Sequence, residues 1–286
     1  MKITSLCEDV SNINDIGQEH GLSMFIQTSK QNVLFDFGAS DLFSINAKKL
    51  HIDLNSVELC FLSHGHYDHG GGIKAFLAIN KFAPIYVSKY AFGSYYALKN
   101  DIYKYIGIDK NLENEKQIKI VDKNKKLDTI LTVFDDIGNY FPNASANKVM
   151  YVPISKKYTN KDYAISDKDL FINDSFCHEQ HLIIAERGIT TLIVGCSHKG
   201  IVNILESFKH KFGKYPDTVI GGFHLQNPTT KVSEPPEYIE KIADYLISTK
   251  CQCYTCHCTG VGVYQILKDK LNDKIVYLSC GESITI

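Results

Sequence analysis

LSHGHYDHGGG, residues 62–72, carries His64, His66, Asp68 and His69 directly after an apolar run and directly before a helical pattern. Histidine nitrogen and carboxylate oxygen are ligands that suit divalent transition metals. In an extended chain, residues i and i+2 point to the same side, so the first two histidines can bind one ion while Asp68 and His69 face a second. A histidine-rich surface turn formed by chance is the alternative. Four ligand-type residues at this spacing favour a metal site.

Strand and helix patterns alternate on both sides of this turn. The elements expected in the first half are a hairpin over 22–38, strands at 57–64 and 84–89, and helices at 41–50 and 71–80. The second half repeats the order, with a hairpin over 181–198, alternating helices and strands, and a last strand pair at 274–286. Two such halves predict an α/β protein in which two mixed β-sheets pack face to face with helices outside, a four-layer αββα sandwich.

The alternation breaks down between about residues 90 and 174, where we expect some helix between Tyr90 and Tyr105. Long loops in a compact domain are usually lids or disordered, and the aromatic content argues against disorder. We therefore expect a single domain over 1–286 with an insertion at about 90–174 that forms a cap or lid. Its tyrosines suit stacking on a flat ring and equally suit an ordinary packed cap. These tyrosines are Tyr90, Tyr95, Tyr96, Tyr103, Tyr105, Tyr140, Tyr151, Tyr158 and Tyr163.

Charge and cysteine content narrow the class of protein. With 31 basic and 32 acidic residues, the 286-residue chain has a formal net charge of −1, which predicts binding neither to nucleic acid nor to a membrane surface. No apolar run approaches the ~20 residues that cross a bilayer, and the N-terminus is too polar for a signal peptide. Nine cysteines, an odd number in a long chain, indicate reduced thiols. We expect a cytoplasmic protein that acts on a small molecule, in an oligomeric state that the sequence leaves open.

Other histidines are candidates to complete the site, because residues that follow strand ends converge at one edge of an α/β sheet. Those that end predicted strands or lie in turns beside them are His20, His198, His224 and His257. The remaining candidates lie in polar or helical parts of the sequence, where we expect an exposed or hydrogen-bonded ring. These are His51, His178, His181 and His210.

The pattern of residues 64–69, His-x-His-x-Asp-His, resembles the metal-binding HxHxDH motif of the metallo-β-lactamase superfamily. Later segments resemble one branch of that superfamily, the 7,8-dihydropterin-6-yl-methyl-4-(β-D-ribofuranosyl)aminobenzene-5′-phosphate synthases. The segments that carry this resemblance are, in order, EHGLS, VLFDFG, LSHGHYDHGGG, VGCSHKGIVN, IGGFHL and HCTG. The resemblance covers most of the chain outside the insertion and implies the αββα fold.

The resemblance also implies a binuclear metal site. The ligands of the first metal would be His64, His66 and His198, and those of the second would be Asp68, His69 and His257. Many relatives have a bridging aspartate after the second hairpin, where this chain has Cys196, which would either act as a soft bridge or ligand or merely pack.

Further residues have two interpretations each. Asp36 would orient a metal-bound histidine, or it would cap a turn before Gly38. His224 and His20 would face the substrate, or they would be hydrogen-bonded structural residues. The four cysteines of CQCYTCHC, residues 251–258, include one C-x₂-C pair with no second pair to complete a zinc tetrahedron, so we expect most of them to be core thiols.

The expected metal is zinc, one or two ions per protomer, with manganese or iron as alternatives. Histidine stands at position 66, where the diiron flavoprotein branch of the fold has glutamate, and this favours zinc.

The residues and the resemblance together predict a metal-dependent hydrolase with Asp68 as its catalytic residue. A metal-bound hydroxide, available because zinc lowers the pKa of water from ~15.7 to about 7, would attack a small phosphorylated or ester substrate. Asp68 would hold the proton and orient the hydroxide. The resembled branch instead implies a transferase in which an aryl ring displaces pyrophosphate from a pterin diphosphate. The third hypothesis is a non-catalytic metal-binding sensor.

Overall fold

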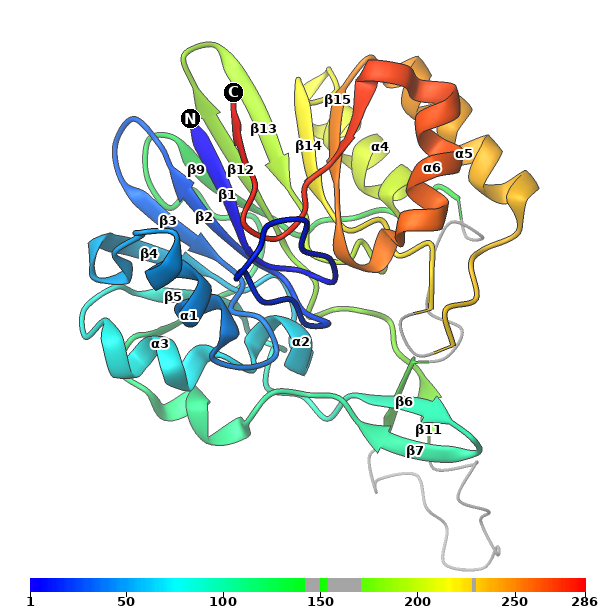
Figure 1. Ribbon diagram of the computed structural model, residues 1–286. Coiled ribbons are helices and arrows are strands. Elements are labelled where there is room, and N and C mark those ends of the chain that lie inside the picture. Colours follow the sequence, from blue (N-terminus) through cyan, green and yellow to red (C-terminus); the bar gives the residue numbers. More distant parts are fainter. Residues whose placement is uncertain (142–149, 154–170, 228–229) are drawn as a thin grey trace, which may run out of the picture.

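The computed structural model describes residues 1–141, 150–153, 171–227 and 230–286. Two large mixed sheets lie face to face, with helices on both outer sides (Figure 1). The first sheet has the strand order β17-β1-β2-β3-β4-β5-β8, and the second has the order β16-β15-β14-β13-β12-β9. The predicted four-layer αββα sandwich of the α/β class is therefore confirmed.

The strands of the first sheet are β1 (Lys2–Cys7), β2 (Ser23–Gln27), β3 (Asn32–Phe35), β4 (Val57–Phe61), β5 (Ile85–Ser88), β8 (Ile118–Val121) and β17 (Ser283–Thr285). Those of the second are β9 (Leu131–Phe134), β12 (His181–Glu186), β13 (Ile189–Ile193), β14 (Thr218–Gly221), β15 (Gln252–Thr255) and β16 (Ile275–Tyr277). The longer helices are α1 (Leu42–Lys49), α3 (Ile73–Ile79), α4 (Ile201–Phe212), α5 (Pro236–Thr249) and α6 (Val261–Leu271).

Period-two alternation along the strands divides the apolar residues among three cores. On β3, Val33 and Phe35 face the second sheet, whereas Leu34 faces the core under α1 and α3. On β12, Ile184 faces the first sheet and Ile183 faces the core under α4, α5 and α6. Because both faces of each sheet are covered, the strands are buried, and polar side chains gather at the strand ends.

The last two strands do not pair with each other, contrary to expectation. β16 completes the second sheet beside β15, whereas β17 pairs antiparallel with β1 at the edge of the first sheet. The N-terminal ammonium donates to the carbonyl oxygen of Ile286 at 2.7 Å, so the two chain ends lie side by side (Figure 1).

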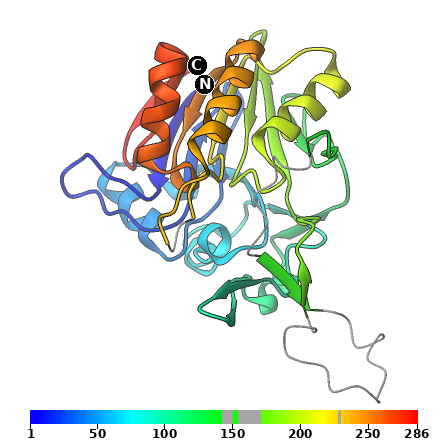
Figure 2. The same cartoon turned by 90° about the vertical axis from the view of Figure 1, so that its right-hand side faces the viewer.

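A third, four-stranded sheet lies outside the sandwich (Figure 2) and is formed by β6 (Tyr96–Lys99), β7 (Ile102–Tyr105), β10 (Met150–Pro153) and β11 (Phe171–Asn173). The helix expected between Tyr90 and Tyr105 is wrong. Asn100 and Asp101 have φ of 50° and 60°, the left-handed pair that a tight hairpin turn requires, and aromatic residues favour strands on either side.

The segment from 90 to 174 is not confined to this small sheet, since β8 and β9 extend the two main sheets. The single domain with an insertion stays a prediction. Rings on one face of the small sheet pack against one another, for example Tyr103 on Phe171 with centroids 3.8 Å apart. This packing supports the interpretation of these tyrosines as an ordinary cap; Tyr158 and Tyr163 lie outside the described residues. No helix within the described part of the chain is long and apolar enough to cross a membrane.

Candidate metal centre

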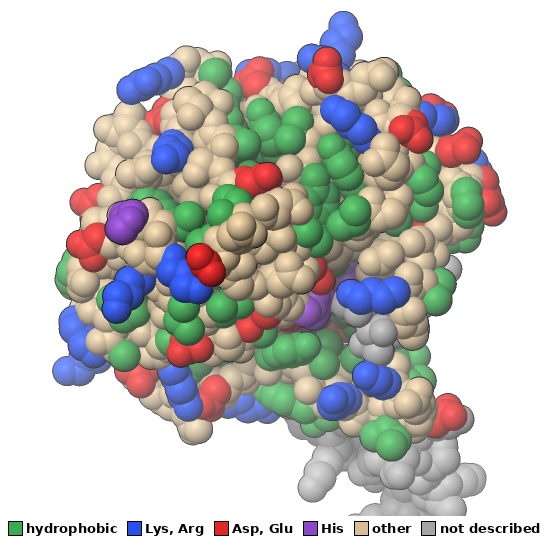
Figure 3. Space-filling model, viewed as in Figure 1, with side chains coloured by type: hydrophobic (Ala, Val, Ile, Leu, Met, Phe, Trp, Pro, Cys, Tyr) green, Lys and Arg blue, Asp and Glu red, His purple; other side chains and the backbone are tan. Residues whose placement is uncertain are grey.

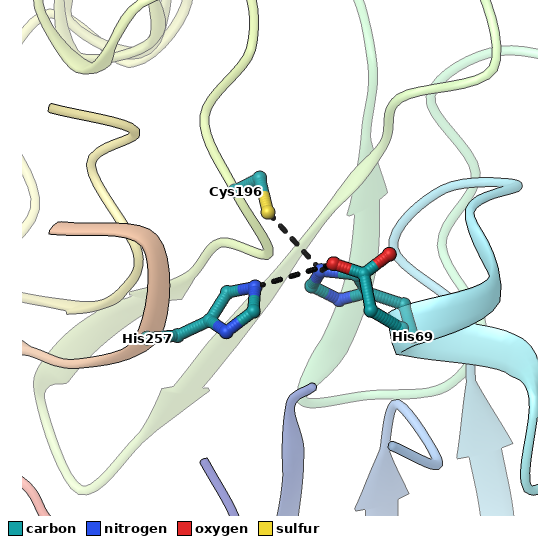
Figure 4. Close-up of side chains that lie close together, drawn as sticks. His69, Cys196 and His257 are labelled. Atoms are coloured by element: carbon teal, nitrogen blue, oxygen red, sulfur yellow. Dashed lines mark hydrogen bonds and ion pairs between the residues drawn. The ribbon is translucent and has the colours of Figure 1, made fainter. Parts of the chain in front are cut away.

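The motif of residues 64–69 lies just beyond the carboxyl end of β4, at the edge where other segments from distant parts of the chain arrive. His198 follows β13, His224 follows β14 and His257 follows β15, and these three strands run parallel. Figure 4 shows side chains of His69 and His257 turned toward each other with Cys196 beside them. The structure thus brings together the residues that the sequence proposed as ligands.

The first group consists of three imidazoles with converging nitrogen atoms. His64 Nε2 lies 3.0 Å from His66 Nδ1 and 3.2 Å from His198 Nε2. Ligand nitrogens at zinc distances of ~2.0–2.1 Å stand about 3.3 Å apart in a tetrahedron, so these separations match a shared cation. All three rings are buried.

The second group combines a carboxylate, two imidazoles and a thiol. Asp68 Oδ2 lies 3.6 Å from His69 Nε2 and 3.5 Å from His257 Nε2. His69 Nε2 is also 3.1 Å from Cys196 Sγ. The ligand atoms of these four residues all lie within 4.8 Å of one another, a spacing that one metal ion can span.

Cys196 belongs to both groups. Its sulfur lies within 4.8 Å of ligand atoms of His64 and His198 as well as those of the second group. Of the two interpretations of this residue, the geometry supports a bridge or ligand over mere packing.

Polar groups behind the rings hydrogen-bond to Nδ1, which leaves the lone pairs of the Nε2 atoms facing the other ligand groups. The carboxylate of Asp36 accepts from His69 Nδ1 at 2.6 Å and from the Ser63 hydroxyl at 2.7 Å. Ser63 Oγ in turn can accept from His64 Nδ1 at 2.9 Å. With Nδ1 protonated on both rings, each Nε2 presents a lone pair to the ligand groups. The backbone of Asp36 is left-handed with φ of 57°, and its side chain is not simply a turn cap.

His257 has a corresponding support that was not predicted from the sequence. Asp9, just after β1, accepts from His257 Nδ1 at 2.6 Å and contacts His20 Nδ1 at 2.9 Å. His20 Nε2 lies 3.3 Å from Asp68 Oδ2, so this ring joins two carboxylates at the edge of the second group. The backbone N–H of His257 donates to Glu8 at 3.0 Å. An acidic pair directly after a strand was the available signal.

Two more buried carboxylates fix segments beside the first group by hydrogen bonds. Glu179 accepts from the backbone N–H groups of His198 and Lys199 at 2.6 and 3.0 Å, which fixes the turn that carries the ligand. His178, expected to be exposed or hydrogen-bonded, is buried and hydrogen-bonded. Its Nδ1 accepts from the Gly65 N–H at 2.9 Å, while its Nε2 lies 3.1 Å from Asp174.

His224 and Cys258 lie beside the ligand groups. The ring centroid of His224 is 4.4 Å from that of His198. Cys258 Sγ lies within 4.8 Å of ligand atoms of His224 and Cys196, so this cysteine is more than the core thiol that we expected. The other three cysteines of the 251–258 segment are buried.

Electrostatics differ between the two groups. Burial lowers the pKa of His64 and His198 and brings that of His66 to about 3, so these rings are unprotonated and ready to bind a metal. Burial alone would raise the pKa of Asp68, but the three imidazoles around it hold that pKa well below its usual range. Burial would also lower the pKa of His257, yet Asp9 and other neighbours hold it well above its usual range. The second group therefore attracts positive charge.

These residues fit a divalent metal. His257 Nε2, the ring atom that faces the second group, is buried without a hydrogen-bond partner among the described residues, a costly state that a cation would relieve. The groups could hold one or two ions, since a cavity of about 250 Å³ reaches residues of both. Its lining includes His20, His224 and Cys258, which places both predicted substrate-facing histidines at the cavity.

Comparisons with known proteins agree with this geometry. Residues 16–157 match the family model of the metallo-β-lactamase superfamily. An uncharacterized protein of Methanocaldococcus jannaschii is 29% identical over 273 residues, 94% of each chain. From the same organism, 7,8-dihydropterin-6-methyl-4-(β-D-ribofuranosyl)-aminobenzene-5′-phosphate synthase is 25% identical over an alignment of 299 residues, covering 99% of this chain and 96% of its own.

Solved structures extend the comparison. Tm1679, a metal-dependent hydrolase of the β-lactamase superfamily, is 28% identical and aligns with a TM-score of 0.79 over 100% of this chain and 99% of its own. Zn²⁺-bound PqqB from Methylobacterium extorquens aligns over 100% of both chains with a TM-score of 0.58 at 10% identity, which shows a shared fold. The resemblance predicted from the sequence is confirmed.

Asp9→Asn should weaken metal binding, because Asp9 orients the ring of His257 from behind. We expect an affinity for zinc about 10–100-fold lower, measured by competition with a chromophoric chelator. Asp41→Asn is the matched control, since Asp41 is exposed at the start of α1 and its side chain makes no capping hydrogen bond. Equal affinity in wild type and Asp9→Asn would show that this carboxylate does not support a metal ligand.

Cys196→Ser tests the bridging role of the thiol. Cobalt(II) bound by a thiolate absorbs in the near ultraviolet, so the cobalt-loaded wild type should show this band and the variant should lose it. Cys253→Ser is the control, because Cys253 lies in the core under the helices of the second sheet. A band that survives in Cys196→Ser would assign the sulfur ligand elsewhere.

Proposed function

We propose that this chain, a protein of the metallo-β-lactamase superfamily, is a metal-dependent hydrolase of small phosphorylated or ester substrates. The observation that carries the proposal is the convergence of the two ligand groups, which share Cys196, on one cavity. The likeness to a metal-dependent hydrolase over the full chain supports it. We further propose zinc as the metal, one or two ions per protomer, because imidazoles and a thiol suit zinc.

Divalent ions bound here would lower the pKa of a water molecule and stabilise negative charge on a substrate oxygen. The protein supplies the base and the positioning. Asp68 stays a carboxylate at neutral pH because the surrounding imidazoles lower its pKa, so it can accept a proton from an attacking water molecule. His20 contacts Asp68 at one ring nitrogen and Asp9 at the other, which holds its ring at the cavity wall. His224 lines the same cavity and is proposed to face the leaving group.

A transferase acting on a pterin diphosphate is the second candidate. It is favoured by one observation, the 25% identity to a dihydropterin–ribofuranosylaminobenzene phosphate synthase along nearly the whole chain. We place hydrolysis first because the 28% identical hydrolase structure aligns equally completely with a TM-score of 0.79. Bound metal ions could hold phosphate in both reactions, but the two differ in the attacking group and in the atom attacked. Water would attack phosphorus or a carbonyl carbon in hydrolysis, whereas the aryl ring would attack the carbon that bears the diphosphate and release pyrophosphate.

A cytoplasmic location belongs to the same proposal. All nine cysteines are free thiols, and eight of them are buried. Free thiols persist in a reducing compartment, which supports this assignment.

Asp68→Ala should abolish turnover and leave the fold intact, because Asp68 is the proposed base and its side chain packs little apolar surface. The assay is the hydrolysis of a panel of chromogenic phosphodiesters and lactones by the metal-loaded protein, with and without chelator. We expect a loss of about 10²–10⁴-fold in kcat, the usual contribution of a positioned base. Asp41→Ala is the control for removing a carboxylate.

Full activity in Asp68→Ala would contradict the role of this residue. Pyrophosphate release that depends on an aromatic acceptor, with no hydrolysis in the panel, would identify the transferase instead. Tight zinc binding without any turnover would identify the non-catalytic sensor.

A further inference from the structure

A second hollow of about 500 Å³ adjoins the cavity at the metal centre. The two share four lining residues, Tyr67, Ala97, Ile106 and Met150, so they lie side by side against the same part of the molecule. Figure 3 shows a histidine side chain within the recess between the sandwich and the part of the molecule below it, with basic side chains around the opening. A ligand at the metal centre can therefore extend into this second hollow.

The register of the β6–β7 hairpin places two lysines on one face. Ala97 pairs with Lys104 and Lys99 pairs with Ile102, so the side chains of Ala97, Lys99 and Lys104 share that face. All three line the second hollow. On such a hairpin, Lys99 and Lys104 are diagonal neighbours, whose side chains come within reach of each other.

The far end of the hollow has the chemistry of an anion site. Besides the two lysines, it is lined by Asn100, Asn227 and Thr230, and no acidic residue stands among the described lining residues. Two ammonium groups on one face repel each other, and an anion between them converts this repulsion into attraction. Tyr67, Ala97, Ile106 and Met150, which line both hollows, supply apolar surface where the second hollow meets the cavity at the metal centre.

The hairpin is fixed to the metal-binding turn. The backbone N–H of Tyr67 donates to the carbonyl of Ile106 at 2.9 Å, and Gly107 forms a β-bridge with His66. The N–H of Ile106 donates to Tyr95 at 2.9 Å. The distance between the lysine pair and the metal ligands is therefore set by the backbone.

We propose that the second hollow is an anion subsite, in which Lys99 and Lys104 bind a phosphate or carboxylate on the part of the substrate that does not react. The substrate class is then a small molecule with two ends: a hydrolysable ester or phosphoester at the metal centre and a separate anionic group at the lysine pair. The substrate assignment rests on the proposed function. The anion subsite itself has a binding test that does not depend on turnover.

The kinetic test compares two chromogenic esters with the metal-loaded full chain: the 4-nitrophenyl ester of thymidine 5′-phosphate with and without a 3′-phosphate. Water attacks phosphorus, the bond to the nitrophenyl oxygen breaks, and nitrophenolate is released in both. We expect the 3′-phosphate to lower KM about tenfold in wild type, as one or two charge-assisted hydrogen bonds would. Lys99→Gln/Lys104→Gln should lose this preference and keep kcat for the ester that lacks the second phosphate.

Lys241→Gln on α5, exposed and on the outer helix layer, is the control for removing a lysine and should keep the preference. Suppose that both esters are turned over, and that the KM of the ester with the 3′-phosphate is the same in wild type and in the double variant. This result would overturn the anion subsite and leave the hydrolase intact.

A binding test separates the subsite from catalysis. The probe is thymidine 3′,5′-bisphosphate, in which one phosphate can bind at the metal centre while the other reaches the lysine pair. Calorimetry with the same metal-loaded proteins should show affinity about tenfold weaker in Lys99→Gln/Lys104→Gln than in wild type. If neither ester is turned over but this difference is found, the hydrolase fails and the subsite stands. Equal affinity in the two proteins would overturn the subsite whatever the turnover.

Discussion

The structure depends on one costly arrangement: buried imidazole nitrogens, a carboxylate and a thiol that face one another instead of water. His64 Nε2 has two other ring nitrogens within 3.2 Å. His69 Nε2, whose ring donates to Asp36 through Nδ1, faces Cys196 Sγ at 3.1 Å and Asp68 Oδ2 at 3.6 Å. Converging lone pairs and an unpaired buried nitrogen are unfavourable in a low-dielectric interior. A divalent cation turns the same contacts into bonds, so this crowding is the strongest physical argument for a metal.

This arrangement arises because several strands end at the same edge of the sandwich, where the residues that follow them meet. Asp36 follows β3 directly, and within five residues of the ends of β4, β13 and β15 come the 64–69 motif, His198 and His257. A layer of carboxylates then stands behind the ligands, with Asp36 behind His69 and Asp9 behind His257. Since these acids accept hydrogen bonds from Nδ1, they fix both the tautomer and the direction of each ring.

Most of what could be predicted from the sequence depended on patterns among neighbouring residues. The ligand spacing at 64–69, the hairpins at 22–38 and 181–198 and the helices were visible because each depends on neighbours a few residues away. Asp9 could not be found in this way, because its hydrogen bond to His257 joins positions 248 residues apart. The role of Cys258 was hidden for the same reason: Cys196, its neighbour at the site, is 62 positions earlier in the chain. The β6–β7 hairpin was missed because Asn-Asp is a weaker turn signal than Asn-Gly.

Anomalous diffraction from crystals of the metal-loaded protein, recorded on both sides of the zinc absorption edge, would show whether these residues bind zinc. We expect one or two peaks at about 2.0–2.3 Å from the facing atoms of His64, His66 and His198, and of Asp68, His69 and His257, with Cys196 between them. Peaks confined to the surface, or a site with no anomalous signal at saturating zinc, would contradict this expectation.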